Sequence, residues 1–359
     1  MTGRGRDTPV HGALLVDKPS GPTSHDIVAF ARRALKTSAI GHTGTLDPLA
    51  TGLLVLLVGH ATRLARFLVT DQKEYLADIR LGRATETYDA DPAFRPRAEA
   101  NGTGEEAASP QSSAGVSTPR SPEEAARDHL EPGGSRQVAE AAAGQRESGG
   151  FPFQAEEIER ILAQFLGTFP QMPPPFSAKK VDGVRAYKKA RRHEPVELKP
   201  VHVTLHAAHV IAQTPGAEDP GLLRLHIVCS AGFYVRSLAH DIGQLLGCGA
   251  HLEALRRTAA GRFRLADALT LDAIEAAGTG IEARLIGLNT LLADMPAATL
   301  TDEGTRRAGH GNTLAPAHLA AASGADSGTN VRLLDASGRL LSVAERRSDG
   351  LLHPLLVLR

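Results

Sequence analysis

The residue whose surroundings best suit it to chemistry is Asp47, which lies in a glycine-rich segment. The segment reads Gly41-His42-Thr43-Gly44-Thr45-Leu46-Asp47-Pro48-Leu49-Ala50-Thr51-Gly52, and we expect it to form a loop between a helix and a buried strand. Glycine allows positive φ values and lets the backbone approach a ligand closely. Pro48 favours an extended backbone at Asp47 and fixes the direction in which its carboxylate leaves the loop. A carboxylate held in this way is a candidate nucleophile or general base.

Two other interpretations of this segment need no catalysis by the aspartate. A phosphate-binding loop requires the pattern GxxxxGK followed by Ser or Thr, but Gly52 is followed by Leu53, so this interpretation fails. An aspartate in a turn can also serve only to accept hydrogen bonds from its own backbone. The local sequence leaves that second interpretation open, and motifs elsewhere in the chain have to decide.

The elements that must position this carboxylate follow from hydrophobic periodicity. Apolar residues spaced as on one helical face follow Thr23 or Ser24, either of which can cap the helix, and continue to Leu35. Strands are expected where apolar residues run together or alternate with polar ones. The expected strands are 13–16, 53–58, 74–81, 201–210 and 222–229, and the further expected helices are 61–68, 158–166, 234–246 and 271–277.

Residues 97–150 differ in composition from the rest of the chain. They are rich in Gly, Ser, Ala, Pro and Glu and contain almost no large apolar side chains. Such a stretch cannot offset the entropy of its own ordering by burial, so we predict a disordered insertion. It carries five Lys or Arg and nine Asp or Glu, whereas the whole chain has 40 of each class. The remaining residues are therefore mildly basic, which supports an RNA partner only weakly.

The chain changes character again near Pro296. Short apolar runs at 331–334, 340–343 and 351–358 are separated by the turn sequences Asp-Ala-Ser-Gly and Ser-Asp-Gly. This pattern predicts a small β-rich domain. We therefore expect a catalytic domain at 12–295, interrupted by the insertion, and a second domain at 296–359.

Signals for a cofactor, a metal or a membrane are weak in this sequence. Cys229 and Cys248 form no CxxC pair, so a cysteine-based zinc site is not expected. A strand would place His202 and His206 on one face and His209 on the other, so we expect no metal site there either. The chain starts without an apolar signal core, and its apolar runs are far too short to cross a bilayer. We expect a cytoplasmic protein that has no contact with a membrane.

The Asp47 segment resembles a known family motif along its whole length. It matches every specified position of GHTGxLDPxATG, the motif that carries the catalytic aspartate of the bacterial tRNA pseudouridine-55 synthases. Other stretches within 12–96 and 151–295 resemble motifs of the same family. They are Asp17-Lys18-Pro19-Ser20-Gly21-Pro22-Thr23-Ser24, Lys73-Glu74-Tyr75, Thr85-Glu86-Thr87-Tyr88-Asp89-Ala90-Asp91, Pro175-Phe176-Ser177-Ala178-Lys179-Lys180 with Gly183 and Tyr187, Cys229-Ser230-Ala231-Gly232-Phe233-Tyr234-Val235-Arg236, and Leu255-Arg256-Arg257-Thr258. The insertion at 97–150 departs from the family pattern but leaves each of these motifs intact.

The resemblance implies both a fold and an activity. The fold would be α/β, with a mixed, largely antiparallel sheet of the pseudouridine synthase type, followed by a small β-rich domain similar to a PUA module. The activity would be isomerisation of uridine 55 in the T loop of tRNA to pseudouridine, with the target base flipped out of its stack. Substrate and product contain the same atoms, so no cofactor is expected. We also expect a monomer that needs no protein partner.

The resemblance also implies roles for individual residues. Asp47 would be the catalytic carboxylate, acting either as a nucleophile at C1′ of the ribose or as a base on a ribose proton. Arg236 would hold that carboxylate with its two-pronged guanidinium, and Tyr75 would stack on the uracil. Further substrate-binding residues would be His42, Tyr234, Leu255, Lys18, Arg63 and Lys180, and the basic cluster Lys188, Lys189, Arg191 and Arg192 would contact RNA phosphates. For Tyr75, Tyr234 and Leu255, plain packing in the core stays an open alternative.

Two rival functions fit the same motifs. One is a tRNA-binding or tRNA-folding protein without catalysis, and the other is a guide-RNA-dependent pseudouridine synthase that works in a multiprotein particle. The presence of Asp47, Tyr75 and Arg236 argues against the first, because a pure binder does not need them. Activity of the purified chain on a bare tRNA transcript would separate all three.

Overall fold

The computed structural model describes residues 10–68, 72–90, 151–176, 180–181, 184–185, 198–217, 219–321 and 324–358. The insertion predicted at 97–150 and the cluster Lys188, Lys189, Arg191 and Arg192 lie outside these residues, so both stay predictions. Of Lys180 only the backbone is described, at the start of β6 (Lys180–Val181), which pairs with β7 (Val184–Arg185).

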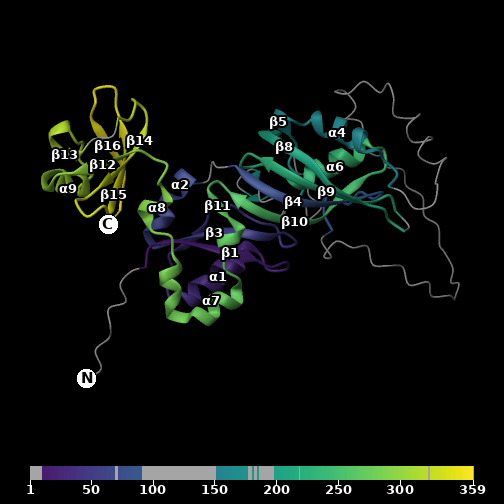
Figure 1. Cartoon of the computed structure of the whole chain (residues 1–359), viewed down its shortest axis with the longest axis horizontal. Coiled ribbons are helices and arrows are strands. Elements are labelled where there is room, and N and C mark those ends of the chain that lie inside the picture. Colours follow the sequence, from purple (N-terminus) through teal and green to yellow (C-terminus); the bar gives the residue numbers. More distant parts are fainter. Residues whose placement is uncertain are drawn as a thin grey trace, which may run out of the picture.

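The larger of the sheets runs through much of the molecule (Figure 1). All its strand pairings are antiparallel except that of β3 with β10, which is parallel. The predicted mixed, largely antiparallel sheet is therefore confirmed. Among the described residues it has nine strands, in the order β1 (Gly12–Lys18), β3 (Thr51–Val58), β10 (Ala250–Ala260), β4 (Lys73–Leu81), β9 (Gly221–Cys229), β8 (Val201–Thr214) and β5 (Gly167–Gln171), with β2 (Ile40–His42) beside β3 and β11 (Phe263–Arg264) beside β10.

Helices cover one face of this sheet. They are α1 (Ser24–Ala34), α4 (Ala155–Ala163), α6 (Val235–Leu245) and α7 (Leu271–Ala277), and their apolar residues share one core with the inward residues of the strands. The helix α1 begins after Thr23 rather than after Ser24. Thr23 Oγ1 accepts a hydrogen bond from the amide of Asp26, and the Asp26 carboxylate accepts one from the amide of Thr23. This reciprocal cap fixes where the helix starts, directly after the β1 turn.

The strands β1 and β3 are buried on both faces. Leu54 and Leu56 face the helix-covered core, whereas Leu53 and Val55 pack in a second apolar cluster that also contains Leu340. A strand covered on both sides needs apolar residues at every position. This is why 53–58 reads as an unbroken apolar run.

A separate sheet follows near the C-terminus, as predicted. Among the described residues it has five strands, in the order β13 (Leu319–Ala321), β12 (Ala297–Leu300), β14 (Asn330–Leu334), β15 (Leu340–Arg346) and β16 (Leu352–Val357), with α9 (Asp302–Gly309) against it. The runs predicted as strands are β14, β15 and β16. Figure 1 places this sheet at one end of the molecule, beside α2 (Ala65–Leu68) and α8 (Leu288–Leu291). Its likeness to a PUA module stays a prediction.

Four local predictions differ from the structure. No strand is predicted over Ala250–Ala260, yet β10 lies inside the larger sheet. The helix expected at 61–68 is a 3-10 helix, η1 (Gly59–Leu64), followed by the single turn α2. The loop expected at 41–52 is shorter, because its ends belong to β2 and β3. The helix expected at 158–166 is α4, which ends at Ala163, and the short strand β5 follows it.

The remaining short 3-10 helices are η5 (Leu265–Asp267), η6 (Gly278–Arg284) and η7 (Pro316–His318).

Side chains along β8 do not alternate between the two faces as they would in a regular strand. Its register against β9 shifts between Leu205 and Ala207, as in a β-bulge. His202, His206 and His209 are consequently all exposed, rather than divided between two faces. Among the described residues no group of three or more His, Cys, Asp or Glu could hold a metal ion.

Candidate active site

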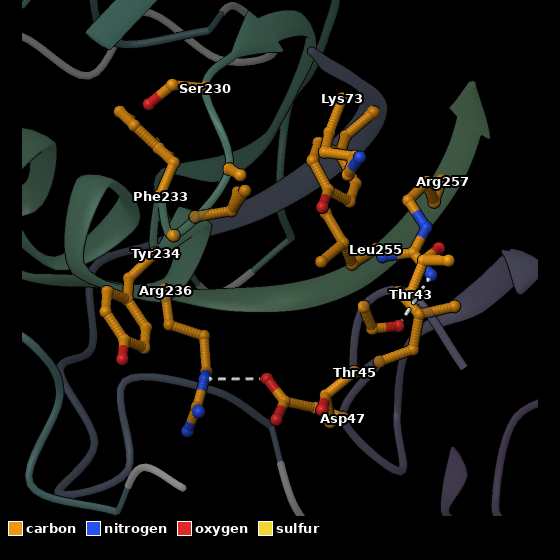
Figure 2. A pocket seen from close by; sticks show the side chains of 16 residues that line it. Thr43, Thr45, Asp47, Lys73, Ser230, Phe233, Tyr234, Arg236, Leu255 and Arg257 are labelled. Carbon is orange, nitrogen blue, oxygen red and sulfur yellow. Dashed lines mark hydrogen bonds and ion pairs between the residues drawn. The ribbon is translucent and has the colours of Figure 1, made fainter. Parts of the chain in front are cut away.

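A pocket of about 350 Å³ opens where four segments meet. The Asp47 loop, β4, the turn before α6 and β10 all contribute to its wall, through residues that include Asp47, Tyr75, Tyr234 and Leu255. Figure 2 shows Asp47 and Arg236 pointing toward one another in this pocket. The residues expected to do the chemistry, far apart in sequence, are therefore brought together in space.

Two buried polar side chains, one from the last residue of β1 and one from the first residue of α1, hold the Asp47 loop in place. Lys18 has no exposed surface, and its ammonium group donates a hydrogen bond of 2.6 Å to the carbonyl of Ala50. Ser24 is also buried, and its hydroxyl donates to the carbonyl of Leu46 (3.0 Å) and accepts from the amide of the same residue (2.9 Å). Both flanks of Asp47 are thus fixed to the segment that precedes and begins α1.

Lys18 supports this loop and does not reach the pocket. Its ammonium group also donates to the carbonyl of Pro48, the residue directly after Asp47. Burial lowers the pKa of Lys18 to about 8, and the nearby Asp47 carboxylate opposes that shift. Because this side chain has no exposed surface, its position favours support of the Asp47 loop over the predicted contact with substrate, which stays a prediction.

Arg236 divides its guanidinium between two carboxylates. Its Nε lies 3.0 Å from Oδ2 of Asp47, and its Nη1 lies 3.3 Å from Oδ2 of Asp89. The same group donates to the carbonyls of Thr87 (3.3 Å) and Phe176 (3.2 Å). Its side chain is 8 % exposed, that of Asp89 5 % and that of Asp47 37 %. The predicted ion pair between Arg236 and Asp47 is present. The guanidinium does not bind Asp47 with two nitrogen atoms, however, because Nη1 faces Asp89 instead. Asp47 remains partly exposed to the pocket.

The start of α6, which carries Arg236, is fixed by the strand β5 and the residue after it. The buried Gln171 side chain accepts a hydrogen bond from the amide of Tyr234 (2.8 Å) and donates one to its carbonyl (3.0 Å). One helical position after Arg236, the Ser237 hydroxyl donates to the carbonyl of Met172 (2.7 Å). These bonds orient the first turn of α6 and with it the guanidinium.

Tyr75 and Arg257 form the opposite part of the wall. Arg257 is 3 % exposed and donates to the carbonyls of Leu53 (2.6 Å) and Gly44 (3.1 Å). Burial raises the pKa of the Tyr75 hydroxyl, while the positive charge of Arg257 and a hydrogen bond from its side chain oppose that rise. Tyr75 is mostly buried yet lines the pocket, so it is at once a core residue and a wall residue.

Close packing between β3 and β10 demands a glycine at position 52. Gly52 pairs with Arg257 and has a φ of 95°. A Cβ atom added there would lie 2.3 Å from the carbonyl oxygen of Arg257. Only glycine fits both the conformation and the space, so the last residue of the motif keeps β10 against the Asp47 loop.

Two other residues predicted to bind substrate do not line the pocket. His42 lies in β2 edge-on to His25, with 5.9 Å between ring centres, and burial followed by the charges of His25 and Arg257 lowers its pKa. Arg63 lies in η1 and donates to the carbonyl of Val357 in β16. Neither residue lines the pocket, so the predicted contacts of His42 and Arg63 with substrate stay predictions, and Arg63 connects η1 to the C-terminal sheet. Nothing in its local sequence reveals that contact.

Three residues that shape the pocket were not predicted as site residues. They are Asp89, Ser24 and Arg257, each inside a stretch that resembles a family motif. The motifs could have found them, because buried polar side chains need partners, but sequence does not show which partner each one has.

Helices in the described part of the chain are all too short or too polar to span a membrane. This agrees with the absence of a long apolar run in the sequence.

Two family models match the chain. The TruB family pseudouridylate synthase model (N-terminal domain) matches residues 32–110 and 136–235, and the model of the tRNA pseudouridylate synthase B C-terminal domain matches 236–295. The second match covers α6, β10 and α7, whereas the five-stranded C-terminal sheet lies beyond it.

Curated relatives carry one common name, tRNA pseudouridine synthase B. The protein of Opitutus terrae is 42 % identical over 77 % of this chain and 92 % of its own length. Those of Solibacter usitatus and Burkholderia mallei are 36 % and 37 % identical over 97 % and 96 % of this chain, and over 99 % and 95 % of their own lengths.

Among solved structures, the fold resembles that in a crystal structure of the archaeal box H/ACA sRNP Nop10-Cbf5 complex. The TM-score is 0.60 at 19 % identity, over 97 % of this chain and 86 % of the other. At this identity the likeness supports the fold alone. The sequence relatives and the family models go further: the chain belongs to the TruB family of pseudouridylate synthases, which isomerise a uridine of tRNA to pseudouridine.

Proposed function

We propose that the chain isomerises uridine 55 in the T loop of tRNA and that the Asp47 carboxylate is the group that acts on the ribose. The observation that carries this proposal is the ion pair of 3.0 Å between Asp47 and the buried Arg236, at the wall of a pocket in which Asp47 is still 37 % exposed. A nucleophile or base needs both an oriented carboxylate and an open side toward the substrate.

The charges around Arg236 suit the chemistry. One guanidinium faces two carboxylates, Asp47 and Asp89, so the three side chains together carry a net negative charge when ionised. Breaking the bond between uracil and ribose develops positive charge at C1′. A fixed negative charge beside that carbon stabilises this state, and it costs no reorganisation because Arg236 already holds both carboxylates. Asp89 is the buried anchor of the guanidinium, and Asp47 is the carboxylate that meets the sugar.

The wall of the pocket suits a flipped uracil. Tyr75 and Leu255 supply apolar surface beside Asp47, and Tyr234 lies at the start of α6 close to Arg236. An extruded base loses its stacking neighbours at a cost of a few kcal/mol, and an aromatic side chain replaces part of that contact. In this arrangement Tyr75 stacks on the base, and its hydroxyl is oriented by Arg257.

The proposed enzyme works as a cytoplasmic monomer without a guide RNA or a protein partner. The curated relatives that carry the name tRNA pseudouridine synthase B support this, because they match 77 % and 97 % of this chain at 42 % and 36 % identity. The particle-forming structures match at 19 %.

The decisive experiment incubates the purified full-length chain with an unmodified tRNA transcript and maps pseudouridine by position. We expect modification at position 55 and none in a transcript that has cytidine there. The Asp47→Asn variant should fold but show no turnover. Its matched control is Asp294→Asn, which removes an exposed carboxylate outside the pocket and should keep wild-type turnover.

Three results would contradict the proposal in different places. Turnover by Asp47→Asn close to that of the wild type would remove Asp47 from catalysis. Pseudouridine at another position of the transcript would overturn the assignment to position 55. Activity that appears only after a guide RNA and further proteins are added would favour the particle-forming rival.

A further inference from the structure

Tyr88 has a backbone conformation that needs an explanation. Its φ is 62°, in the left-handed region, where a bulky side chain crowds the backbone. Among the described residues the other non-glycine residue with positive φ is Lys36, which lies just past the end of α1, a place where this conformation is common. Tyr88 ends no helix. A strained residue of this kind persists only where its surroundings hold it, and such residues gather at functional sites.

The ring of Tyr88 is held by a histidine of α6. The rings of Tyr88 and His240 stack with 3.9 Å between their centres and 14° between their planes. Burial lowers the pKa of His240, which favours the neutral form of the ring. The carbonyl of Tyr88 also accepts a hydrogen bond of 3.0 Å from the amide of Leu252 in β10. Tyr88 is thus fixed between a helix and a central strand.

The two neighbours of Tyr88 both contact one nitrogen atom of Arg236. The carbonyl of Thr87 and the carboxylate of Asp89 each lie 3.3 Å from Nη1. His240 follows Arg236 by four residues and therefore lies on the same face of α6, one turn further. The consecutive residues Thr87, Tyr88 and Asp89 therefore all contact one face of α6, through the side chains of Arg236 and His240.

The left-handed backbone at Tyr88 allows these contacts with α6 to form together. In an extended segment the side chains of Tyr88 and Asp89 would point to opposite sides. The turn at Tyr88 directs both toward α6, so that the ring meets His240 while the carboxylate meets Arg236. The strained backbone at Tyr88 therefore places the Tyr88 ring and the Asp89 carboxylate on the same side of the chain.

We propose that the stack of Tyr88 on His240 is a positioning device for the catalytic pair. It holds Asp89 against Arg236, and Asp89 in turn fixes the guanidinium that orients Asp47. Neither ring belongs to the described lining of the pocket, so both act through Arg236 rather than on the substrate. This inference rests on the proposed role of Asp47.

The test compares two substitutions of Tyr88. Tyr88→Phe keeps a stacking ring, whereas Tyr88→Gly accepts the positive φ without strain but removes the ring. We expect Tyr88→Phe to keep kcat within about twofold of the wild type. Tyr88→Gly should lose about 10-fold to 100-fold in kcat, because a displacement of about 1 Å at a catalytic group has effects of this size. The dissociation constant for tRNA should not change in either variant.

The partner ring gives a second, independent measurement. His240→Ala should lose as much kcat as Tyr88→Gly, and the double variant should lose no more than either single one, because each removes the same stack. The matched control is His60→Ala, which removes a stack of almost equal geometry, with 3.9 Å between the centres of His11 and His60, outside the pocket lining. It should leave kcat unchanged.

Wild-type kcat in Tyr88→Gly, well below its melting temperature, would overturn the inference. So would a loss in Tyr88→Phe as large as in Tyr88→Gly, because the hydroxyl and not the stack would then matter. A change confined to tRNA affinity would also overturn it. If Asp47→Asn is inactive but Tyr88→Gly is fully active, only this inference is contradicted. If Asp47→Asn is active, the proposed function itself is contradicted.

Discussion

Two nearly buried arginines line the same pocket but contact different partners. Arg236 comes from the start of α6, and Arg257 comes from β10. Arg236 faces the carboxylates of Asp47 and Asp89. Arg257 donates to the carbonyls of Leu53 and Gly44 and to the hydroxyl of Tyr75. The first arginine therefore balances charge, and the second holds neutral groups in place.

This difference separates two ways of building an active site. A buried carboxylate that loses its cation is left as an uncompensated charge, which costs more than any single hydrogen bond. A carbonyl that loses a donor costs only that bond and its desolvation. The α6 region should consequently be sensitive in both activity and stability, and the β10 region mainly in stability.

The largest effect is expected for Arg236→Lys. An ammonium group cannot occupy the positions of Nε and Nη1 together, so residue 236 loses its contact with either Asp47 or Asp89. We expect kcat to fall about 100-fold or more, and the free energy of unfolding to fall by about 3 kcal/mol because Asp89 is buried. Single-turnover kinetics on tRNA and urea unfolding measure the two effects. Near-normal kcat in a folded variant would mean that the pairing does not orient Asp47.

Arg257→Lys should show the opposite balance. The lysine keeps the charge but cannot reach Leu53, Gly44 and Tyr75 at the same time. We expect a loss of about 2 kcal/mol in unfolding free energy, the scale of one hydrogen bond from a charged donor, and a decrease in kcat below about 10-fold. A kcat loss as large as that of Arg236→Lys, in a variant that stays folded, would erase the distinction between the two regions.

Asp241 extends the comparison to a partly buried carboxylate of α6, whose pKa is raised to about 6 by burial. In the unfolded chain an aspartate ionises near pH 4. Between about pH 4 and pH 6 the folded state thus retains a proton that the unfolded state has released, so stability should fall as the pH rises through this window. Asp241→Asn should remove that slope and be more stable at pH 7 by about 2 kcal/mol. Thermal denaturation at pH 4 and pH 7 tests this, and a slope that survives the substitution would assign it to another group.

Ser24→Ala should give the smallest effect on stability. The variant loses both hydrogen bonds to Leu46, which we expect to cost about 1 kcal/mol of stability. We also expect a loss of up to about 10-fold in kcat, because Leu46 precedes Asp47. The matched control is Ser342→Ala. Ser342 is equally buried and donates to the carbonyl of Leu356 in the C-terminal sheet at 2.8 Å. It should cost similar stability and leave kcat unchanged. Equal kcat losses in both variants would show that stability, not the loop, sets the rate.

Sequence and structure agree where a pattern is local. The strands β1, β3 and β4 and the helices α1, α6 and α7 follow directly from hydrophobic periodicity. The strand β10 does not, because its register shifts twice, between Leu252 and Ala254 and between Arg257 and Ala259. Each shift breaks the alternation of apolar and polar residues, and a buried arginine occupies a position where an apolar residue would be expected.

For the pocket, the sequence predicts which residues are important better than it predicts what they touch. Asp47, Arg236, Tyr75, Tyr234 and Leu255 do line one pocket. Lys18 and Arg63 were expected to bind substrate because of the family resemblance. Their partners are carbonyl groups supplied by tertiary structure, and no short pattern encodes such distant contacts.

The position of β4 between β9 and β10 has a consequence for the order in which the protein folds during synthesis. Tyr75 pairs with Ile227 on one side and Arg257 on the other, so its neighbours leave the ribosome long after it. The antiparallel pair of β1 and β3 can form early. The parallel pairing of β3 with β10 must wait for nearly the whole catalytic region and pay the closure entropy of a very long loop. The pocket is consequently among the last parts of the nascent chain to assemble, and a polypeptide released before Ala250 would lack one of its walls.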